Sequence, residues 1–184
     1  KTKHPVPMDT RGWSQILASI VTGIPGLARK KGPDLADGSD VKGANTWEAI
    51  DTPRFNGALK AGTKATVSGS LALLDAQPYL ILVLWDHNTR AQARCRIWVV
   101  RTQKDKLFRE MGRQWYKNRE AGIIKSANFQ LHPPRGKDEN IIRNTCGNLE
   151  YPLLLSATRN PDSGYKIDYF NKSILETGQC KSAQ

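Results

Sequence analysis

Residues 79–85 read YLILVLW, a continuously apolar run of the length expected for a β-strand. A second strand pattern follows at Ala93–Arg101, and the polar cluster Asp86–Thr89 between the two is typical of a turn. Upstream, Thr63–Leu73 alternates and is rich in Thr, Val and Ser, which also favours a strand. The simplest arrangement of the three segments is a β-meander.

The segments before and after these strands have apolar residues at helical spacing. Thr10 could cap a helix whose apolar residues, from Trp13 to Ile24, recur every three or four positions up to the break at Pro25. The same spacing returns in Lys104–Glu120, whose aromatic residues we expect in the core. Beyond Ala121 the pattern is less regular and favours loops around short apolar runs. The sequence predicts an α+β fold with a central mixed β-sheet flanked by helices, in a single domain over residues 1–184.

The charge of the chain indicates a polyanionic partner. Its 28 Lys and Arg residues exceed its 17 Asp and Glu residues and give a net charge of +11. DNA, RNA and anionic membranes all attract such a charge. The apolar runs are far shorter than the roughly 20 residues of a spanning helix, so we expect no membrane association and favour nucleic acid. The alternative is that the charge only keeps the protein soluble.

The three cysteines, Cys95, Cys146 and Cys180, are odd in number and widely separated. This distribution predicts neither a disulfide framework nor a zinc knuckle. A reducing compartment, the cytoplasm of a bacterial cell, is therefore the expected location.

Residues 32–42 read GPDLADGSDVK and contain the most distinctive polar pattern. Because residues i and i+2 of a strand share a face, Asp40 and Lys42 would project together while Val41 packs inward. Asp34, across a short turn, can fold back to meet Asp40. Two carboxylates and a backbone carbonyl can hold Mg²⁺, and a neighbouring lysine can orient an attacking water. Since about one acid-x-Lys triplet is expected by chance, the argument depends on its setting, a tight turn entering a strand.

Residues 33–34 and 40–42 resemble the motif of the PD-(D/E)XK nuclease superfamily, and in particular of its type II restriction endonucleases. The short spacing is similar to that of mismatch-repair and Sau3AI-type nucleases, and residues 40–47 and 128–135 resemble MamI-type restriction enzymes. The resemblance implies a restriction-endonuclease-like fold and Mg²⁺-dependent double-strand cleavage by a homodimer. It also implies that Asp34 and Asp40 are metal ligands and that Lys42 orients water.

Other acids leave alternatives open. The gap between the two motif acids is shorter than in most relatives, so Asp37 could be the first ligand instead of Asp34. Many relatives also take an acid from the preceding helix, whereas only Asp9 precedes Asp34 here. Glu48 and Asp51 could line the same cleft, although turn or helix-start positions are the simpler interpretation.

Basic and amide side chains suited to DNA gather in two places. Residues 128–148 have the composition of a loop or short helix that enters the major groove, where Arg reads guanine and Asn reads adenine. Alternation places Arg94 and Arg96 on one strand face, where they could grip phosphates. The alternative for residues 128–148 is an exposed polar loop without a partner. The candidate DNA-contacting residues are Arg94, Arg96, His132, Arg135, Lys137, Arg143 and Asn144.

The sequence thus predicts a type II restriction endonuclease that uses Mg²⁺ to cut double-stranded DNA. One alternative is a non-catalytic nucleic-acid-binding module in which the motif acids are turn residues, and another is a repair- or structure-directed nuclease of the same superfamily. His87 with Asn88 is similar to fragments of His-Asn nucleases. That chemistry needs a second histidine on a nearby helix, for which only His4 and His132 remain.

Overall fold

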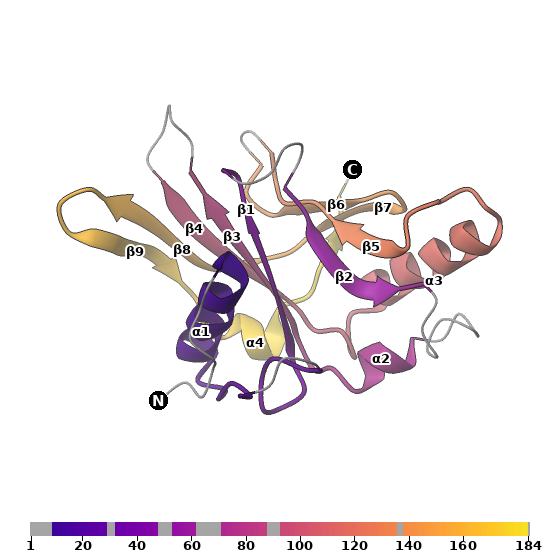
Figure 1. Ribbon diagram of the computed structural model, residues 1–184, viewed down its shortest axis with the longest axis horizontal. Coiled ribbons are helices and arrows are strands. Elements are labelled where there is room, and N and C mark those ends of the chain that lie inside the picture. The colour runs from indigo at the N-terminus through magenta and orange to yellow at the C-terminus, as the bar shows by residue number, and fades with distance from the viewer. Residues whose placement is uncertain are drawn as a thin grey trace.

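The computed structural model describes residues 9–28, 32–47, 53–61, 71–87, 93–135 and 138–183. Figure 1 shows the arrangement of its helices and strands. In chain order, the elements are α1 (Thr10–Thr22), β1 (Asp40–Asn45), β2 (Phe55–Lys60), α2 (Ala72–Asp75), β3 (Leu80–Asp86), β4 (Arg94–Val100), α3 (Lys106–Glu120), β5 (Asn128–Leu131), β6 (Ile141–Asn144), β7 (Gly147–Glu150), β8 (Leu153–Asn160), β9 (Gly164–Phe170), α4 (Ile174–Thr177) and β10 (Lys181–Ser182).

The apolar run at residues 79–85 supplies β3, an inner strand of a five-stranded sheet with the order β1-β3-β4-β8-β9. β3 pairs antiparallel with β4, as the sequence predicts, whereas β1 runs parallel to β3. The sheet is therefore mixed, and helices accompany it, which confirms the predicted α+β fold. The motif strand β1 is not one arm of a hairpin but an edge strand beside the most apolar segment of the chain.

Strand alternation divides the apolar side chains between two cores. Leu80, Leu82 and Leu84 face a core shared with α2, α3 and strands β2, β5, β6 and β7. Ile81 and Val83 face the opposite core, which α1 and α4 cover. Figure 1 shows α1 and α4 on one side of the assembly and α3 with β2 and β5 on the other. The sheet is therefore covered on both faces, which explains why β3 reads as a continuous apolar run.

Helix α1 corrects two details of the sequence-based prediction. Its N-cap is Asp9, whose carboxylate accepts a hydrogen bond from the Gly12 amide at 3.0 Å, and not Thr10. Its exposed surface includes Trp13 at 55% and Ile20 at 65% exposure, because the buried face is lined by small residues such as Ser14 and Ala18. Small side chains let the helix approach the sheet closely.

Helix α3 is confirmed close to its predicted bounds. Asp105 caps it by accepting a hydrogen bond from the Phe108 amide. Phe108, Met111 and Trp115 lie in the core, so the aromatic residues of this helix pack inside the protein and do not stack on nucleic-acid bases. Among the described residues, no helix is both long and apolar enough to cross a bilayer.

The C-terminal half differs most from its prediction. Residues 128–148 form β5, β6 and the start of β7 instead of a loop or short helix, with Ile142 and Leu149 anchoring the β6–β7 pair in the core. The predicted strand Thr63–Leu73 falls largely on residues 62–70, which lie outside the described residues, and Leu73 belongs to α2. The residues Glu48, Asp51, Asn88 and Lys137 also lie outside the described part.

Candidate active site

The motif loop is a tight turn that delivers the chain into β1. The backbone amides of Asp34 and Leu35 both donate to the Ser39 carbonyl, at 3.1 and 3.0 Å, and Leu35 forms an isolated bridge with Gly26. Gly38 turns with φ +95°, and a Cβ there would lie 2.7 Å from the Ala76 carbonyl oxygen. The loop is therefore packed against the segment after α2, and only glycine fits its closest point.

Asp37 is used by this turn. Its two carboxylate oxygens accept hydrogen bonds from the amide and the hydroxyl of Ser39, each at 2.9 Å. The Ser39 hydroxyl in turn accepts from the Tyr79 amide at 3.2 Å. This is the role of an Asx turn, and the geometry favours Asp34 over Asp37 as the first carboxylate of a site.

Asp34 reaches back to β1 as the spacing suggests. One of its carboxyl oxygens accepts from the Val41 amide at 2.9 Å, and the other accepts from Gln15 Nε2 on α1 at 2.6 Å. Burial, together with the adjoining Asp40 carboxyl, raises the pKa of Asp34 to about 7. The two carboxyls are close enough to share a hydrogen bond, so they form a pair at the entrance of β1.

Asp40 and Lys42 share a strand face, while Val41 packs into the opposite core. The Lys42 Nζ lies 2.6 Å from Asp40 Oδ2, and the two side chains are only 22% and 18% exposed. The ion pair holds the ammonium beside both carboxyls. The structure therefore brings together the three residues that sequence reasoning singled out.

These residues fit a divalent cation of the magnesium type. The raised pKa of Asp34 reflects its burial and its repulsion by the Asp40 carboxyl. A cation between the two carboxylates would remove this repulsion. No group of three or more His, Cys, Asp or Glu residues suited to a metal occurs among the described residues. Magnesium keeps several waters and needs only one or two protein carboxylates, so the pair Asp34 and Asp40 would suffice to hold it.

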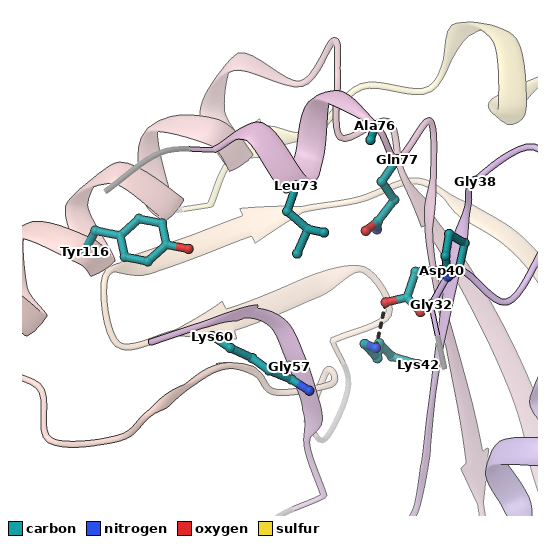
Figure 2. Close-up of a pocket in the computed structure, with 11 residues that line it drawn as sticks. Gly32, Gly38, Asp40, Lys42, Gly57, Lys60, Leu73, Ala76, Gln77 and Tyr116 are labelled. Carbon is teal, nitrogen blue, oxygen red and sulfur yellow. Dashed lines mark ion pairs between the residues drawn. The ribbon is translucent and has the colours of Figure 1, made fainter. Parts of the chain in front are cut away.

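A pocket of about 250 Å³ opens in front of Asp40 and Lys42. Figure 2 shows Lys60 from β2 extending toward Lys42, with Gln77 close to Asp40 and Tyr116 of α3 at the far end. Gln77 is 5% exposed, and its Nε2 has no hydrogen-bond partner within the described residues. These three residues had no signal in the sequence, because they come from three separate segments that only the fold brings to the motif.

Four of the seven DNA-contacting candidates line a second pocket. Arg94 and Arg96 lie on one face of β4, as predicted, and line a pocket of about 290 Å³ with Arg135 and Arg143. His132 pairs through its backbone with Arg143, and burial lowers the pKa of its imidazole. The structure thus unites the strand arginines with two arginines from residues 128–148.

Asn144 has a structural role in the β6–β7 turn. Its side-chain amide donates to the Gln130 carbonyl at 2.6 Å, and its oxygen accepts from the Cys146 amide at 2.8 Å. Both ends of the side chain are occupied, so it is poorly placed to read a base in this conformation.

The geometry supports neither a cysteine nucleophile nor the chemistry of a His-Asn nuclease. Burial raises the pKa of both Cys95 and Cys180 to about 12, which keeps these thiols protonated. His87 packs edge-on against Trp47, with ring centroids 6.3 Å apart. It has no second histidine from a helix beside it within the described residues.

Comparison with known proteins finds similar sequences. The sequence model of the MamI restriction endonuclease family matches residues 1–163. The type II restriction enzyme MamI of Microbacterium ammoniaphilum is 35% identical over 200 aligned positions, which cover 98% of this chain and 64% of that protein. The chain thus spans less than two thirds of the length of that relative. No solved structure matches.

Proposed function

Since the chain belongs to the MamI restriction endonuclease family, we propose that it is a type II restriction endonuclease that hydrolyses phosphodiester bonds of double-stranded DNA at a fixed sequence. The observation that carries this proposal is the meeting of Asp34, Asp40 and Lys42 at the start of β1, where Asp40 and Lys42 line a pocket. This arrangement supports a nuclease of the PD-(D/E)XK type, and residues 1–184 would form one such nuclease domain.

In the proposed site, Asp34 and Asp40 hold Mg²⁺. When bound, Mg²⁺ supplies positive charge that offsets the charge developing on the scissile phosphate. Lys42 orients the attacking water with its ammonium, and its ion pair with Asp40 fixes the position of Nζ. Gln15 and the Val41 amide fix the Asp34 carboxyl through two hydrogen bonds. Each group is therefore held before the substrate arrives, which lowers the cost of orienting it.

The positively charged side chains would hold the duplex across this site. We assign DNA contact to Arg94, Arg96, His132, Arg135, Lys137 and Arg143, and keep Asn144 as a residue that shapes the β6–β7 turn. One site of this type cuts one strand, so a double-strand cut calls for two copies. A homodimer on DNA is the simplest way to supply them.

Digestion of supercoiled plasmid with and without Mg²⁺, followed by sequencing of the ends, tests the proposal. We expect discrete fragments with one end sequence in Mg²⁺ and intact plasmid in EDTA, and we expect Asp40→Asn to be inactive in both. A protein that binds DNA equally well in either buffer and never nicks it would be a non-catalytic binding module. Cleavage with no common end sequence would indicate a structure-directed nuclease instead.

A further inference from the structure

The pocket around Arg96 has features that DNA contact in general does not require. Arg94, Arg96, Arg135 and Arg143 line it, and Arg94 and Arg96 form ion pairs with Asp86 and Glu139. Asp86 is the carboxylate among the described residues that line the pocket. Within the described part of the chain, guanidinium groups therefore outnumber carboxylates at this concave site.

Arg96 is nearly completely buried, with 2% of its side chain exposed. It pairs with Asp86 Oδ2 at 3.5 Å and with Glu139 Oε2 at 3.1 Å, and its guanidinium lies 5.1 Å from the centre of the Trp98 ring. These contacts hold the group rigidly from two sides, so little conformational freedom remains to be lost when a ligand binds.

Despite this burial, two donors have no acceptor. The Nε atoms of Arg96 and Arg143 are buried and have no hydrogen-bond partner within the described residues. A buried donor without an acceptor is costly, and more so when it carries charge. Desolvation and the neighbouring Arg94 also lower the pKa of Arg96. An anion with several oxygens would supply acceptors for these donors. It would also offset the repulsion between Arg96 and Arg94.

We propose that this pocket is a built phosphate site that takes a single phosphodiester group of the bound nucleic acid, held by Arg96 and Arg143 with Arg94 and Arg135 at its rim. The proposal rests on the proposed function for the source of the phosphate. It changes the role expected of Arg143, which grips the backbone here and does not read a base edge.

The position of the pocket suits an anchor for the substrate strand. Asp40 pairs with Leu80 at one end of β3, and Asp86 lies at the other end on the same sheet face. Leu80 and Asp86 are six residues apart along β3, which corresponds to about 20 Å. A duplex aligned with the strands would place about six base pairs between the cleavage site and the anchor.

Titration with inorganic phosphate tests the site without any need for cleavage. In spectra of ¹⁵N-labelled protein, the Nε–H signals of Arg96 and Arg143 should shift saturably while those of arginines outside the pocket, such as Arg113, stay in place. Arg143→Ala should weaken phosphate binding about 10-fold, and Arg143→Lys should restore part of it. Arg113→Ala is the matched control, because it removes an exposed arginine of α3 that pairs only locally with Glu110.

Duplex binding in Ca²⁺ provides the second arm. Arg143→Ala should weaken binding about 10-fold for any DNA sequence, against less than about 2-fold for Arg113→Ala. Uniform phosphate shifts across all arginines, or equal effects of the two variants, would overturn the phosphate site while leaving cleavage untouched. Saturable phosphate binding in a protein that never cuts DNA would keep the site and refute the nuclease.

Discussion

The carboxyl of Asp34 is partly buried and has four neighbours that act on it: the Val41 amide, Gln15, Asp40 and Lys42. The Val41 amide and Gln15 hold its position. Burial and the Asp40 carboxyl oppose its ionisation, whereas Lys42 favours it. Residues in such environments, with a pKa near neutrality and a partner group within reach, are typical of catalytic sites. The closeness of the two carboxyls lowers the stability of the metal-free protein, and it also provides oxygen atoms that can bind a cation.

The raised pKa of Asp34 makes a stability prediction. The unfolded chain loses this proton near pH 4, whereas the folded protein keeps it up to about pH 7. The contribution of Asp34 to the free energy of unfolding is therefore fully present below about pH 4. It is lost as the pH rises from about 4 to about 7, and it does not return at higher pH. At about pH 8 without metal, Asp34→Asn should raise the Tm, because it removes a partly buried charge and its repulsion by Asp40. The expected rise is about 2–4 °C for each kcal/mol regained.

Thermal unfolding measured by fluorimetry checks this prediction. The stabilisation by Asp34→Asn should disappear at about pH 4, and Mg²⁺ at about pH 8 should raise the Tm of the wild type but not that of the variant. Asp162→Asn, at an exposed turn, is the control and should change neither. A variant that is equally destabilised at both pH values would mean that Asp34 is only a structural acceptor.

Lys42 is predicted to act in the chemical step alone. Lys42→Ala should eliminate plasmid cleavage while duplex affinity changes little, since one lost cation alters the salt slope by only about one unit. Lys166→Ala, an exposed lysine on β9, is the matched control and should retain full cleavage. Wild-type cleavage by Lys42→Ala would remove Lys42 from the mechanism.

At the scale of elements, the site depends on how a loop, a short helix and a strand fit together. The motif loop packs against the segment after α2 at Gly38, while α1 reaches the loop through Gln15 and reaches β3 through the hydrogen bond from Trp85 Nε1 to Ser14 Oγ at 2.9 Å. Movement of any of these elements would shift Asp34 relative to Asp40.

Gly38→Ala should show how tight this fit is. The substitution combines a left-handed backbone with a Cβ that would lie 2.7 Å from the Ala76 carbonyl oxygen, so we expect a loss of about 2 kcal/mol or more in urea unfolding together with reduced cleavage. Gly122→Ala has the same backbone penalty but nothing within 4 Å of its Cβ, and should cost only about 1 kcal/mol. Equal losses would show that the loop does not need close contact there.

At the scale of the whole molecule, both pockets open on the same face of the central sheet, one at each end of β1 and β3. Residues of that face include Asp40 and Lys42 at one end and Asp86, Arg94 and Arg96 at the other, with the leucines of β3 between them. Strand β2 and helix α3 line the far side of the first pocket, whereas residues 133–135 and Arg143 of β6 line that of the second. The net charge of +11 favours a polyanion lying across that face.

Duplex affinity should therefore depend strongly on salt. If the basic side chains of this face together neutralise about four phosphates, the slope of log affinity against log salt should be about −4. Filter binding or fluorescence anisotropy in Ca²⁺ between about 50 and 200 mM salt measures it. A flat salt dependence would indicate that the positive charge serves solubility and not DNA binding.

The sequence by itself determined what depends on neighbours along the chain. The apolar run of β3, its pairing with β4, the spacing of α3 and the shared face of Asp40 and Lys42 all follow from local periodicity, and each is confirmed. Residues 128–148 were predicted wrongly, because their polar composition masks short strands that each contribute one or two buried side chains. These are Phe129 and Leu131 of β5 and Ile142 of β6, which pairs with β7.

Only the tertiary structure decided which distant residues share a site. The structure pairs β1 with β3 in parallel, brings Gln77 and Lys60 to the motif, and places Arg96 with Arg143 at one pocket. Each of these contacts joins segments that lie far apart in the sequence. Such contacts form because the apolar side chains on both faces of the sheet must be buried by elements from distant parts of the chain. A local sequence pattern does not show which elements these are.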